Sequence, residues 1–193
     1  MKIRANNIDI EIEDTAEINP QDGDTYTRPV VLLIMGLGMQ LVAWPAQFVQ
    51  ALVDASPLSN PRRVAVGMEG NRLAMLLAVL HRHGGIMTGD QDVFVNVVGG
   101  IRVQETAADL PVLLAVLSSL RNVPLADKTI AFGEVGLSGE LRPVPNGEER
   151  LNEAATHGFK RAIVAKANAP KGGHYKGMEV VAVERLADAL EQA

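Results

Sequence analysis

The sequence predicts an α/β or α+β fold in which mixed sheet and helices form layers. Short apolar segments alternate with segments of helical period from residue 61 onward, which is the pattern of layered folds. Hydrophobic residues make up 47% of the 193 residues, enough to fill a core. Aromatic residues make up only 4%, so that core must consist of aliphatic side chains.

The first fifty residues contain two strand signals and one helix signal. Residues 3–12 alternate between apolar and polar side chains, and this period near two predicts a strand or a hairpin. Residues 14–28 are polar and contain Pro and Gly, so we expect a loop. Residues 30–35 form an unbroken apolar run, typical of a strand buried on both faces. Residues 44–54 carry Trp, Phe and Leu at helical spacing and predict an amphipathic helix.

A regular alternation of strands and helices follows the turn-rich segment 56–61. Strands are expected at residues 63–69, 92–98, 129–135, 161–165 and 179–183. Helices are expected at residues 71–83, 107–121, 147–157 and 184–190. Asn71 suits the N-cap of the first helix. Pro111 falls in the first turn of the second helix, where proline is tolerated, and Gly158 suits the C-cap of the third.

Charge is unevenly distributed along the chain and predicts two domains. Residues 1–56 hold three of the 18 basic and eight of the 23 acidic side chains, whereas the remainder is balanced. Because this change coincides with a turn-rich segment, we expect one domain of residues 1–55 and another of residues 56–193. The net charge of −5 and the isoelectric point near 5.4 exclude a protein that is basic overall, but not a local basic patch.

Missing residues and motifs exclude several kinds of chemistry. Cysteine is absent, which removes disulfides, zinc fingers, iron–sulfur clusters and thiol catalysis. The sequence has no G-x-x-x-x-G-K-[ST] loop and no G-x-G-x-x-G motif, and none of its serines lies in G-x-S-x-G. His81 and His83 are two apart on an expected helix and face different directions. We expect no metal and no cofactor, and we interpret residues 171–176 (KGGHYK) as a solvated turn rather than an anion-binding loop.

The sequence also lacks the signals of secretion and membrane insertion. The N-terminus carries acidic residues where a signal peptide needs an apolar stretch. The longest apolar runs fall short of the roughly 20 residues that a spanning helix needs. We therefore expect a cytoplasmic protein with no membrane partner.

Four long stretches carry a family resemblance. They are ALVDASPLSNPRRVAVGMEGNRLAMLLAVLHRHGG, QDVFVNVVGGIRVQETAADL, FGEVGLSGELRPVPNGEER and EAATHGFKRAIVAKAN. From about residue 51 to the end, the chain closely resembles the C-terminal domain of the bacterial RadA (Sms) DNA-repair family. The resemblance covers about three quarters of the chain. It implies a domain similar to the proteolytic domain of Lon proteases, with Lon-like layers of mixed sheet and helices.

Lon proteases use a Ser–Lys dyad, and the resemblance implies that both members are replaced here. The motif P-S-A-G of the nucleophile matches residues 106–109 (TAAD), so the serine position is Ala107. The lysine motif G-G-x-K-E-K matches residues 146–150, so the lysine position is Glu148. The neighbouring threonine and Arg150 do not replace the dyad, because arginine does not lose its proton usefully. We therefore expect no catalytic residue and no enzymatic activity.

The resemblance further implies a function in recombinational DNA repair. RadA proteins resemble a ring helicase, with a zinc finger, a RecA-like ATPase core and the Lon-like tail, and they drive branch migration of single-stranded DNA that invades a duplex. This chain has no cysteine for the finger and no phosphate loop, so alone it is expected not to hydrolyse ATP. We expect a non-catalytic scaffold for oligomerisation, which in the family means a hexameric ring, and a partner in single-stranded DNA.

Basic side chains of the Lon-like part are the candidate DNA contacts, because arginine suits phosphate. The candidates are Arg62, Arg63, Arg72, Arg142, Arg150, Lys160 and Arg161. Non-specific binding needs several of them on one face. The alternative is an ordinary solvated surface with salt bridges, which the zero net charge of this part favours.

The N-terminal part resembles a different family. The strings RANNIDIEIEDT and RPVVLLIMGLGMQLVAWPAQFVQALVDA look like the start of an α/β-hydrolase, whose buried strand ends at an oxyanion loop. By that resemblance Leu37 is the oxyanion-side residue, but the serine, acid and histidine would lie downstream, where the chain resembles RadA instead. The two resemblances together imply a mosaic chain whose two parts join near residues 50–54. The alternatives are a hydrolase, either a relic Lon-type serine peptidase or an α/β-hydrolase fragment, and an inert structural chimera.

The join creates a conflict over residues 44–54. The hydrolase pattern favours a helix, whereas the RadA pattern favours a strand over residues 47–54, paired in a hairpin with residues 63–69. The spacing of large apolar residues favours the helix, which we predict. Residues 1–43 would then be a β-rich add-on whose strand at residues 30–35 joins a sheet edge.

Overall fold

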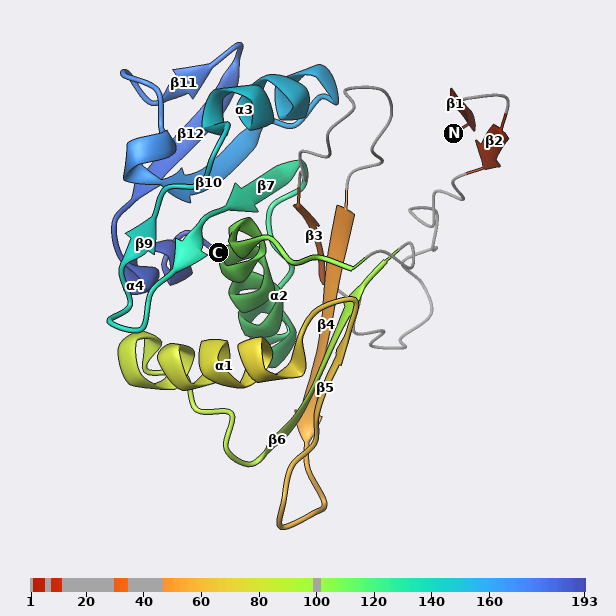
Figure 1. Cartoon of the computed structure of the whole chain (residues 1–193), viewed down its shortest axis with the longest axis vertical. Coiled ribbons are helices and arrows are strands. Elements are labelled where there is room, and N and C mark those ends of the chain that lie inside the picture. Colours follow the sequence, from red (N-terminus) through yellow and green to blue (C-terminus); the bar gives the residue numbers. More distant parts are fainter. Residues whose placement is uncertain (1, 6–7, 12–29, 35–46, 99–101) are drawn as a thin grey trace, which may run out of the picture.

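An eight-stranded mixed sheet forms the centre of the molecule in the computed structural model, which describes residues 2–5, 8–11, 30–34, 47–98 and 102–193 (Figure 1). The strand order is β11-β12-β10-β7-β3-β4-β6-β5. The strands are β3 (Val30–Ile34), β4 (Gln47–Ala55), β5 (Arg63–Val66), β6 (Gln91–Val97), β7 (Thr129–Phe132), β10 (Arg161–Ala165), β11 (His174–Tyr175) and β12 (Met178–Val183). Two small antiparallel pairs complete the strands: β1 (Lys2–Ala5) with β2 (Ile8–Glu11), and β8 (Glu134–Val135) with β9 (Leu141–Arg142). The mixed α/β class is thus confirmed.

Helices cover the two faces of β7 and β10. The helices are α1 (Gly70–Gly84), η1 (Thr106–Ala108), α2 (Asp109–Arg121), α3 (Gly147–Thr156), η2 (Lys166–Asn168) and α4 (Leu186–Leu190). Side chains of α1, α2 and α4 share one buried cluster with Ala131 and Ile163, whereas α3 shares the other with Ile130 and Val164. Successive strand residues therefore enter opposite layers, as the period of two requires.

The helix α2 is the central helix of the core. Its residues from Asp109 to Ser118 are all buried, and it contacts both β4 and α1 (Figure 1). A helix that is apolar all round is stable only when it is surrounded by protein, and α2 fits that description. Among the described helices, none is long and apolar enough to cross a membrane.

The prediction of a helix over residues 44–54 is wrong, because residues 47–55 form strand β4. This strand lies between β3 and β6 and makes an antiparallel ladder with each of them. Val49 and Ala51 are buried while Leu52 is exposed, so the segment follows the period of two. The segment pairs with β3 over residues 47–51 and with β6 over residues 49–55, and this tertiary effect outweighs the local helical spacing. The alternative hairpin with residues 63–69 is also wrong, since β5 pairs in parallel with β6.

The strand expected at residues 30–35 exists, but its expected place at a sheet edge is wrong. Strand β3 is an interior strand that pairs with β4 on one side and with β7 on the other. The hairpin expected at residues 3–12 is confirmed as β1 and β2. The loop at residues 14–28 and the oxyanion-side Leu37 lie outside the described residues. The division into residues 1–55 and 56–193 stays a prediction, and strands from both sides of it share the sheet.

The remaining elements agree with the expected ones within a few residues, with two informative differences. The strand expected at residues 129–135 divides at Gly133 into β7 and β8, and β8 belongs to a separate small sheet. The helix expected at residues 107–121 begins with the 3-10 turn η1. Asn71 lies inside α1, and the N-cap position is Glu69, which makes no capping hydrogen bond through its side chain.

Candidate functional site

Ala107, which the resemblance matches to the Lon serine, is sealed inside the protein. Ala107 lies in η1 and is 0% exposed. Its carbonyl accepts the N–H of Gly133 at 3.1 Å, and the carbonyl of Gly133 accepts the N–H of Leu110 at 3.2 Å. These two bonds fasten the start of α2 to the break between β7 and β8. A methyl group therefore fills the position at which a nucleophile would have to meet a substrate.

The residue that the resemblance matches to the Lon lysine is an exposed carboxylate at the start of α3. Glu148 follows Asn146 and Gly147, and Asn146 adopts a left-handed φ of 58°, which asparagine tolerates. Glu148 accepts a hydrogen bond from the hydroxyl of Tyr175. The pKa of Tyr175 is raised, first by partial burial and then by the negative charge of Glu148. Glu148 therefore places a negative charge where the dyad needs a lysine amine.

An asparagine clamp fixes the loop before α3. The side chain of Asn168 accepts the N–H of Val144 at 2.8 Å and donates to its carbonyl at 2.9 Å. A Cβ on Gly147 would lie 2.5 Å from Nδ2 of Asn168, so only glycine allows this approach. A hollow of about 540 Å³ opens beside the clamp. Its lining includes Asn146, Gly147, Glu148, Glu149, Asn168 and Tyr175.

A buried arginine connects the two degenerate positions. Arg150 of α3 is 1% exposed and forms an ion pair with Glu105, which directly precedes η1. Its Nε donates to the carbonyl of Pro145 at 3.0 Å, and its guanidinium lies 5.8 Å from the ring centroid of Phe132. Burial lowers the pKa of Arg150 to about 10. The group therefore keeps its charge at neutral pH and cannot act as a general base there.

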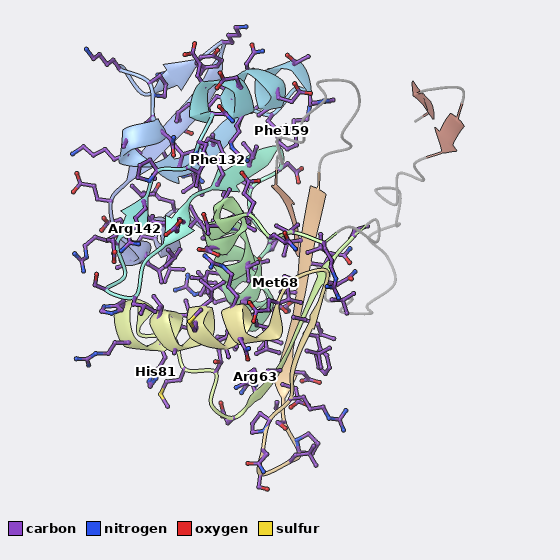
Figure 2. The ribbon with its side chains drawn as sticks, in the orientation of Figure 1. Arg63, Met68, His81, Phe132, Arg142 and Phe159 are labelled. Carbon is purple, nitrogen blue, oxygen red and sulfur yellow. The ribbon has the colours of Figure 1, made fainter. Side chains whose placement is uncertain are left out.

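The expected basic contacts do not form one face. Arg63 lies beside β5 and β6, whereas Arg142 lies on β9 in the opposite part of the molecule (Figure 2). Arg63 donates to the carbonyl of Arg62 at 2.9 Å, to that of Thr88 at 2.5 Å and to that of Gln91. Its guanidinium thus fastens the approach to β6 rather than standing free for phosphate.

Arg72 is held by a buried carboxylate. Its Nε donates to Oδ1 of Asp109 at 2.6 Å, and a second bond joins its Nη2 to Oδ2. Oδ2 also accepts the N–H of Val135 at 3.0 Å, so one carboxylate joins α1, α2 and β8. Asp109 is 1% exposed, and this burial raises its pKa despite the bond from Arg72, while Asp109 raises the pKa of Arg72.

Arg142 and Arg161 are exposed or half-buried but already paired. Arg142 binds Glu134 at 3.3 Å and also Glu140. The pKa of Glu140 falls to about 2, first because the hydroxyl of Ser138 donates to it and then through backbone and Arg142 contacts. Arg161 donates to the carbonyl of Gln192 at 2.8 Å and lies 3.5 Å from Glu179. Neither residue offers an uncommitted charge.

Two of the seven candidates remain exposed without a side-chain partner in the described part of the chain, namely Arg62 and Lys160. Arg62 precedes β5 at one end of the strand order, and Lys160 precedes β10 near the other end. Two further lysines lie beside Lys160, namely Lys128, which sequence reasoning missed, and Lys176, which it assigned to the solvated turn of residues 171–176. The signal that would have found them is their place just before strands that are parallel to one another. We call Lys128, Lys160 and Lys176 the lysine edge.

Metal binding has no visible support in the described residues. No group of three or more His, Asp or Glu side chains in them is arranged to hold a metal ion.

Comparison with known proteins gives the family. A model described as subunit ChlI of Mg-chelatase matches residues 71–168, about half of the chain. DNA repair protein RadA of Escherichia coli is 64% identical over 180 residues, and that of Salmonella typhimurium 66% identical over 180 residues. DNA repair protein RadA of Haemophilus influenzae is 54% identical over 180 residues. Each of these matches covers 93% of this chain but only 38% of the relative.

These matches extend beyond residues 51–193, the part whose sequence resembles the RadA family. Because they include 180 of the 193 residues, they extend well into the segment before residue 51. The likeness of that segment to an α/β-hydrolase stays a prediction. The chain therefore belongs to the family described as subunit ChlI of Mg-chelatase and is a homologue of the bacterial DNA repair proteins named RadA.

Proposed function

We propose that this chain is a non-catalytic, Lon-like scaffold of a RadA-type DNA repair protein and acts by contact rather than by chemistry. The observation that carries the proposal is the sealed position of Ala107 beside the Arg150–Glu105 ion pair. A serine peptidase needs a hydroxyl that reaches the substrate and a base that can take its proton. The site offers a buried methyl group, an exposed carboxylate and a charged guanidinium in their place.

The part of the proposal that concerns DNA repair is supported by the names of the relatives. The family model bears the name of a chelatase subunit and matches half of the chain, whereas the RadA relatives match 93% of it. The RadA relatives, which cover more of the chain, therefore support a function in DNA repair rather than in metal chelation. Because the chain spans 38% of their length, ATP-driven branch migration is proposed only for a longer protein of which this fold is one part.

Three further features belong to the same proposal. The scaffold would act in assembly of a ring, which would be hexameric as in the resembling family. Contact with single-stranded DNA would require cations that are not engaged elsewhere, and the described part of the chain offers such cations at the lysine edge. Location in the cytoplasm follows from the same resemblance.

The experiment that tests the non-catalytic part is a fluorophosphonate labelling of the purified chain, together with casein and ester hydrolysis. A serine hydrolase of known activity serves as the positive control. We expect neither labelling nor turnover above a blank. Labelling or turnover that disappears when one serine is changed to alanine would contradict the proposal and favour the hydrolase alternative.

A further inference from the structure

The strand β5 forms one outer edge of the eight-stranded sheet. It is the last strand in the strand order, and among the described residues it pairs with β6 alone (Figure 1). A strand in this position has no sheet partner for every second N–H and C=O of its backbone. Those groups must bind water or another strand, because an unpaired backbone polar group is costly once it leaves water.

The register with β6 shows which backbone groups of β5 point outward. The N–H of Val93 donates to the carbonyl of Arg62 at 2.9 Å, and the parallel register pairs Arg63 with Val93 and Ala65 with Val95. In a parallel ladder of this register, the backbone groups of residues 62, 64 and 66 point toward β6. The N–H and C=O of Arg63 and of Ala65 therefore point away from the sheet, and each residue offers one donor and one acceptor.

The residues of β5 do not protect this edge against pairing. Edge strands of soluble proteins are commonly protected by a lysine, a proline or an inward-pointing charge. The sequence of β5 is RVAV, which contains neither lysine nor proline. Its one charged side chain, Arg63, is already bonded to the backbone carbonyls of Arg62, Thr88 and Gln91. The outward backbone groups of β5 are therefore open to another strand.

A row of apolar side chains crosses the sheet and ends at the same edge. Phe94 of β6 lies in register with Leu52 of β4 on one side and with Val64 of β5 on the other. Leu52 is 52% exposed and Val64 is 40% exposed, while Phe94 is partly buried. The neighbouring Val93 and Val95 are buried in the cluster that contains α1 and α2, so the row lies on the opposite face of the sheet. We call Leu52, Phe94 and Val64 the apolar row.

We propose that β5 pairs with β5 of a second copy of this chain, antiparallel and about a two-fold axis at Val64. Arg63 and the partner's Ala65 would then exchange both of their backbone hydrogen bonds, and so would Ala65 and the partner's Arg63. The two copies of Val64 would lie directly opposite each other as a pair without hydrogen bonds.

The occupant is a second copy because the edge is complementary to itself. A two-fold contact requires the same surface on both sides, and the two outward-pointing residues flank Val64 symmetrically. One further β5 therefore satisfies all the outward groups of the first. Its own Val64 also extends the apolar row at the point where the sheet ends, so the row continues from Leu52 of one copy to Leu52 of the other.

This contact is separate from the proposed scaffold function and does not depend on it. A ring closes through head-to-tail contacts, whereas a two-fold contact joins two like surfaces and adds no further copy. Strand β5 has four residues, so the pairing is short. It falls below the roughly 1,600 Å² that a stable interface buries, and we expect a weak contact that a covalent bond can capture.

The test uses a single introduced thiol, which is specific because the chain has no cysteine of its own. In Val64→Cys the proposed pairing places two thiols on residues whose Cα atoms lie about 4.5 Å apart, within the range of about 4.4–6.8 Å that a disulfide requires. The full-length variant is oxidised mildly, and the linked dimer is measured by non-reducing electrophoresis. We expect a disulfide-linked dimer that a reductant reverses.

Val66→Cys is the matched control. Val66 lies on the same strand and the same face, and it is 54% exposed, so its thiol is at least as accessible. About the axis at Val64, however, the two thiols of this variant would lie roughly 13 Å apart, because four residue positions separate them along the strand. We expect Val64→Cys to form the dimer on the order of tenfold faster than Val66→Cys. Equal rates would indicate random collision and would overturn the proposal.

A second variant tests whether the contact is backbone pairing. Ala65→Pro, added to Val64→Cys, removes an N–H that points away from β6, a position at which an edge strand tolerates proline. We expect circular dichroism to show a retained fold and the dimer to form at the rate of the control. Unchanged dimer formation in this folded variant would overturn the proposal. If the proline variant does not fold, the comparison of the two cysteine variants decides alone. A folded Val64→Cys sample that forms no dimer would also overturn the proposal and would leave the edge to an extended segment of a different protein.

Discussion

Asp109 carries more of the architecture than any other polar side chain that we describe. It is buried at the first turn of α2 and receives bonds from Arg72 on α1 and from the N–H of Val135 on β8. Arg72 is 31% exposed and Asp109 is 1% exposed, so water reaches only one end of the pair. The loss of either partner should therefore have a different effect on stability, because removing the exposed Arg72 leaves the buried charge of Asp109 without its counter-ion.

This inequality predicts losses of different size for two single variants. Arg72→Met leaves a buried carboxylate without its counter-ion and should lower the free energy of unfolding by about 3 kcal/mol at pH 7. Asp109→Asn keeps an acceptor for the N–H of Val135 and leaves an arginine that water can reach, so it should cost about 1 kcal/mol. Urea unfolding at pH 7 measures both. Equal losses would show that the pair is energetically symmetric.

The same pair predicts a dependence on pH. Burial raises the pKa of Asp109 above its ordinary value, so this group favours the folded state at acidic pH and the benefit is lost as pH rises through the raised pKa. Without Arg72 the pKa should rise further, because a lowering influence is removed. The deficit of Arg72→Met relative to the unchanged chain should therefore shrink between pH 7 and pH 4. A deficit that is constant over that range would contradict the assignment.

A second residue-scale prediction concerns the clamp before α3. Asn168→Ala removes two hydrogen bonds to Val144 and should cost about 2 kcal/mol. Gly147→Ala should cost a similar amount, because the new Cβ would lie 2.5 Å from Nδ2 of Asn168. In the double variant only the contact of 3.1 Å with Cβ of residue 168 remains, so the two losses should not add. Additive losses in a double-mutant cycle would show that the clamp and the glycine act independently.

Site residues were only partly predictable from the sequence, and the reason is the distance along the chain between partners. Arg72 looked like a candidate phosphate contact, but its carboxylate lies 37 positions away and is invisible to local reasoning. Arg150 was likewise a candidate because its ion-pair partner, Glu105, lies 45 positions earlier. Lys160 was found by its charge alone, whereas the other members of the lysine edge appear only when the strands are aligned.

At the scale of elements, the alternation of strands and helices after residue 61 was predictable because each element has a clear period and most are bounded by turn residues. The error at residues 44–54 has a physical cause. Large apolar residues at helical spacing also occur in a strand when both of its neighbours are strands, and β4 has β3 on one side and β6 on the other. The interior place of β3 was unpredictable, since no local signal tells an edge from an interior strand.

The turn between β8 and β9 gives a prediction at the element scale. Gly139 has a φ of 76°, and a Cβ there would lie 2.7 Å from Cβ of His83 at the end of α1. The same turn is fastened by a contact of 3.0 Å between Nε2 of His83 and the carbonyl of Leu137. Gly139→Ala should therefore lower stability by about 2–4 kcal/mol, through both strain and displacement of the turn. Thermal unfolding measures the loss, and a change under 0.5 kcal/mol would mean that the turn adapts freely.

At the scale of the molecule, one half of the sheet is covered by helices, whereas apolar side chains are exposed on described strands of the other half. Helices cover β7 and β10 on both faces. In the other half of the sheet, Leu52 of β4 and Val64 and Val66 of β5 are exposed, with β6 between these two strands. The chain spans 38% of its RadA relatives, so the fold described here is one part of what those proteins contain.

Restoring the two dyad residues should therefore not restore a peptidase. In the double variant Ala107→Ser/Glu148→Lys the serine would replace a side chain that is 0% exposed, next to the Arg150–Glu105 pair. A new hydroxyl at such a place is out of reach of substrate and lacks a desolvated base. We expect no fluorophosphonate labelling and no casein hydrolysis. Labelling of the new serine would show that the site is open in solution and that only two residues separate it from activity.

The central claim is that this chain works by contact with DNA and not by catalysis. The measurement that tests it most directly is the anisotropy of a labelled single-stranded oligonucleotide at several salt concentrations, with light scattering on the same sample. The account predicts binding at low salt that weakens steeply as salt rises, carried by an assembled rather than a monomeric form. Absence of binding at low salt by a folded sample would contradict it.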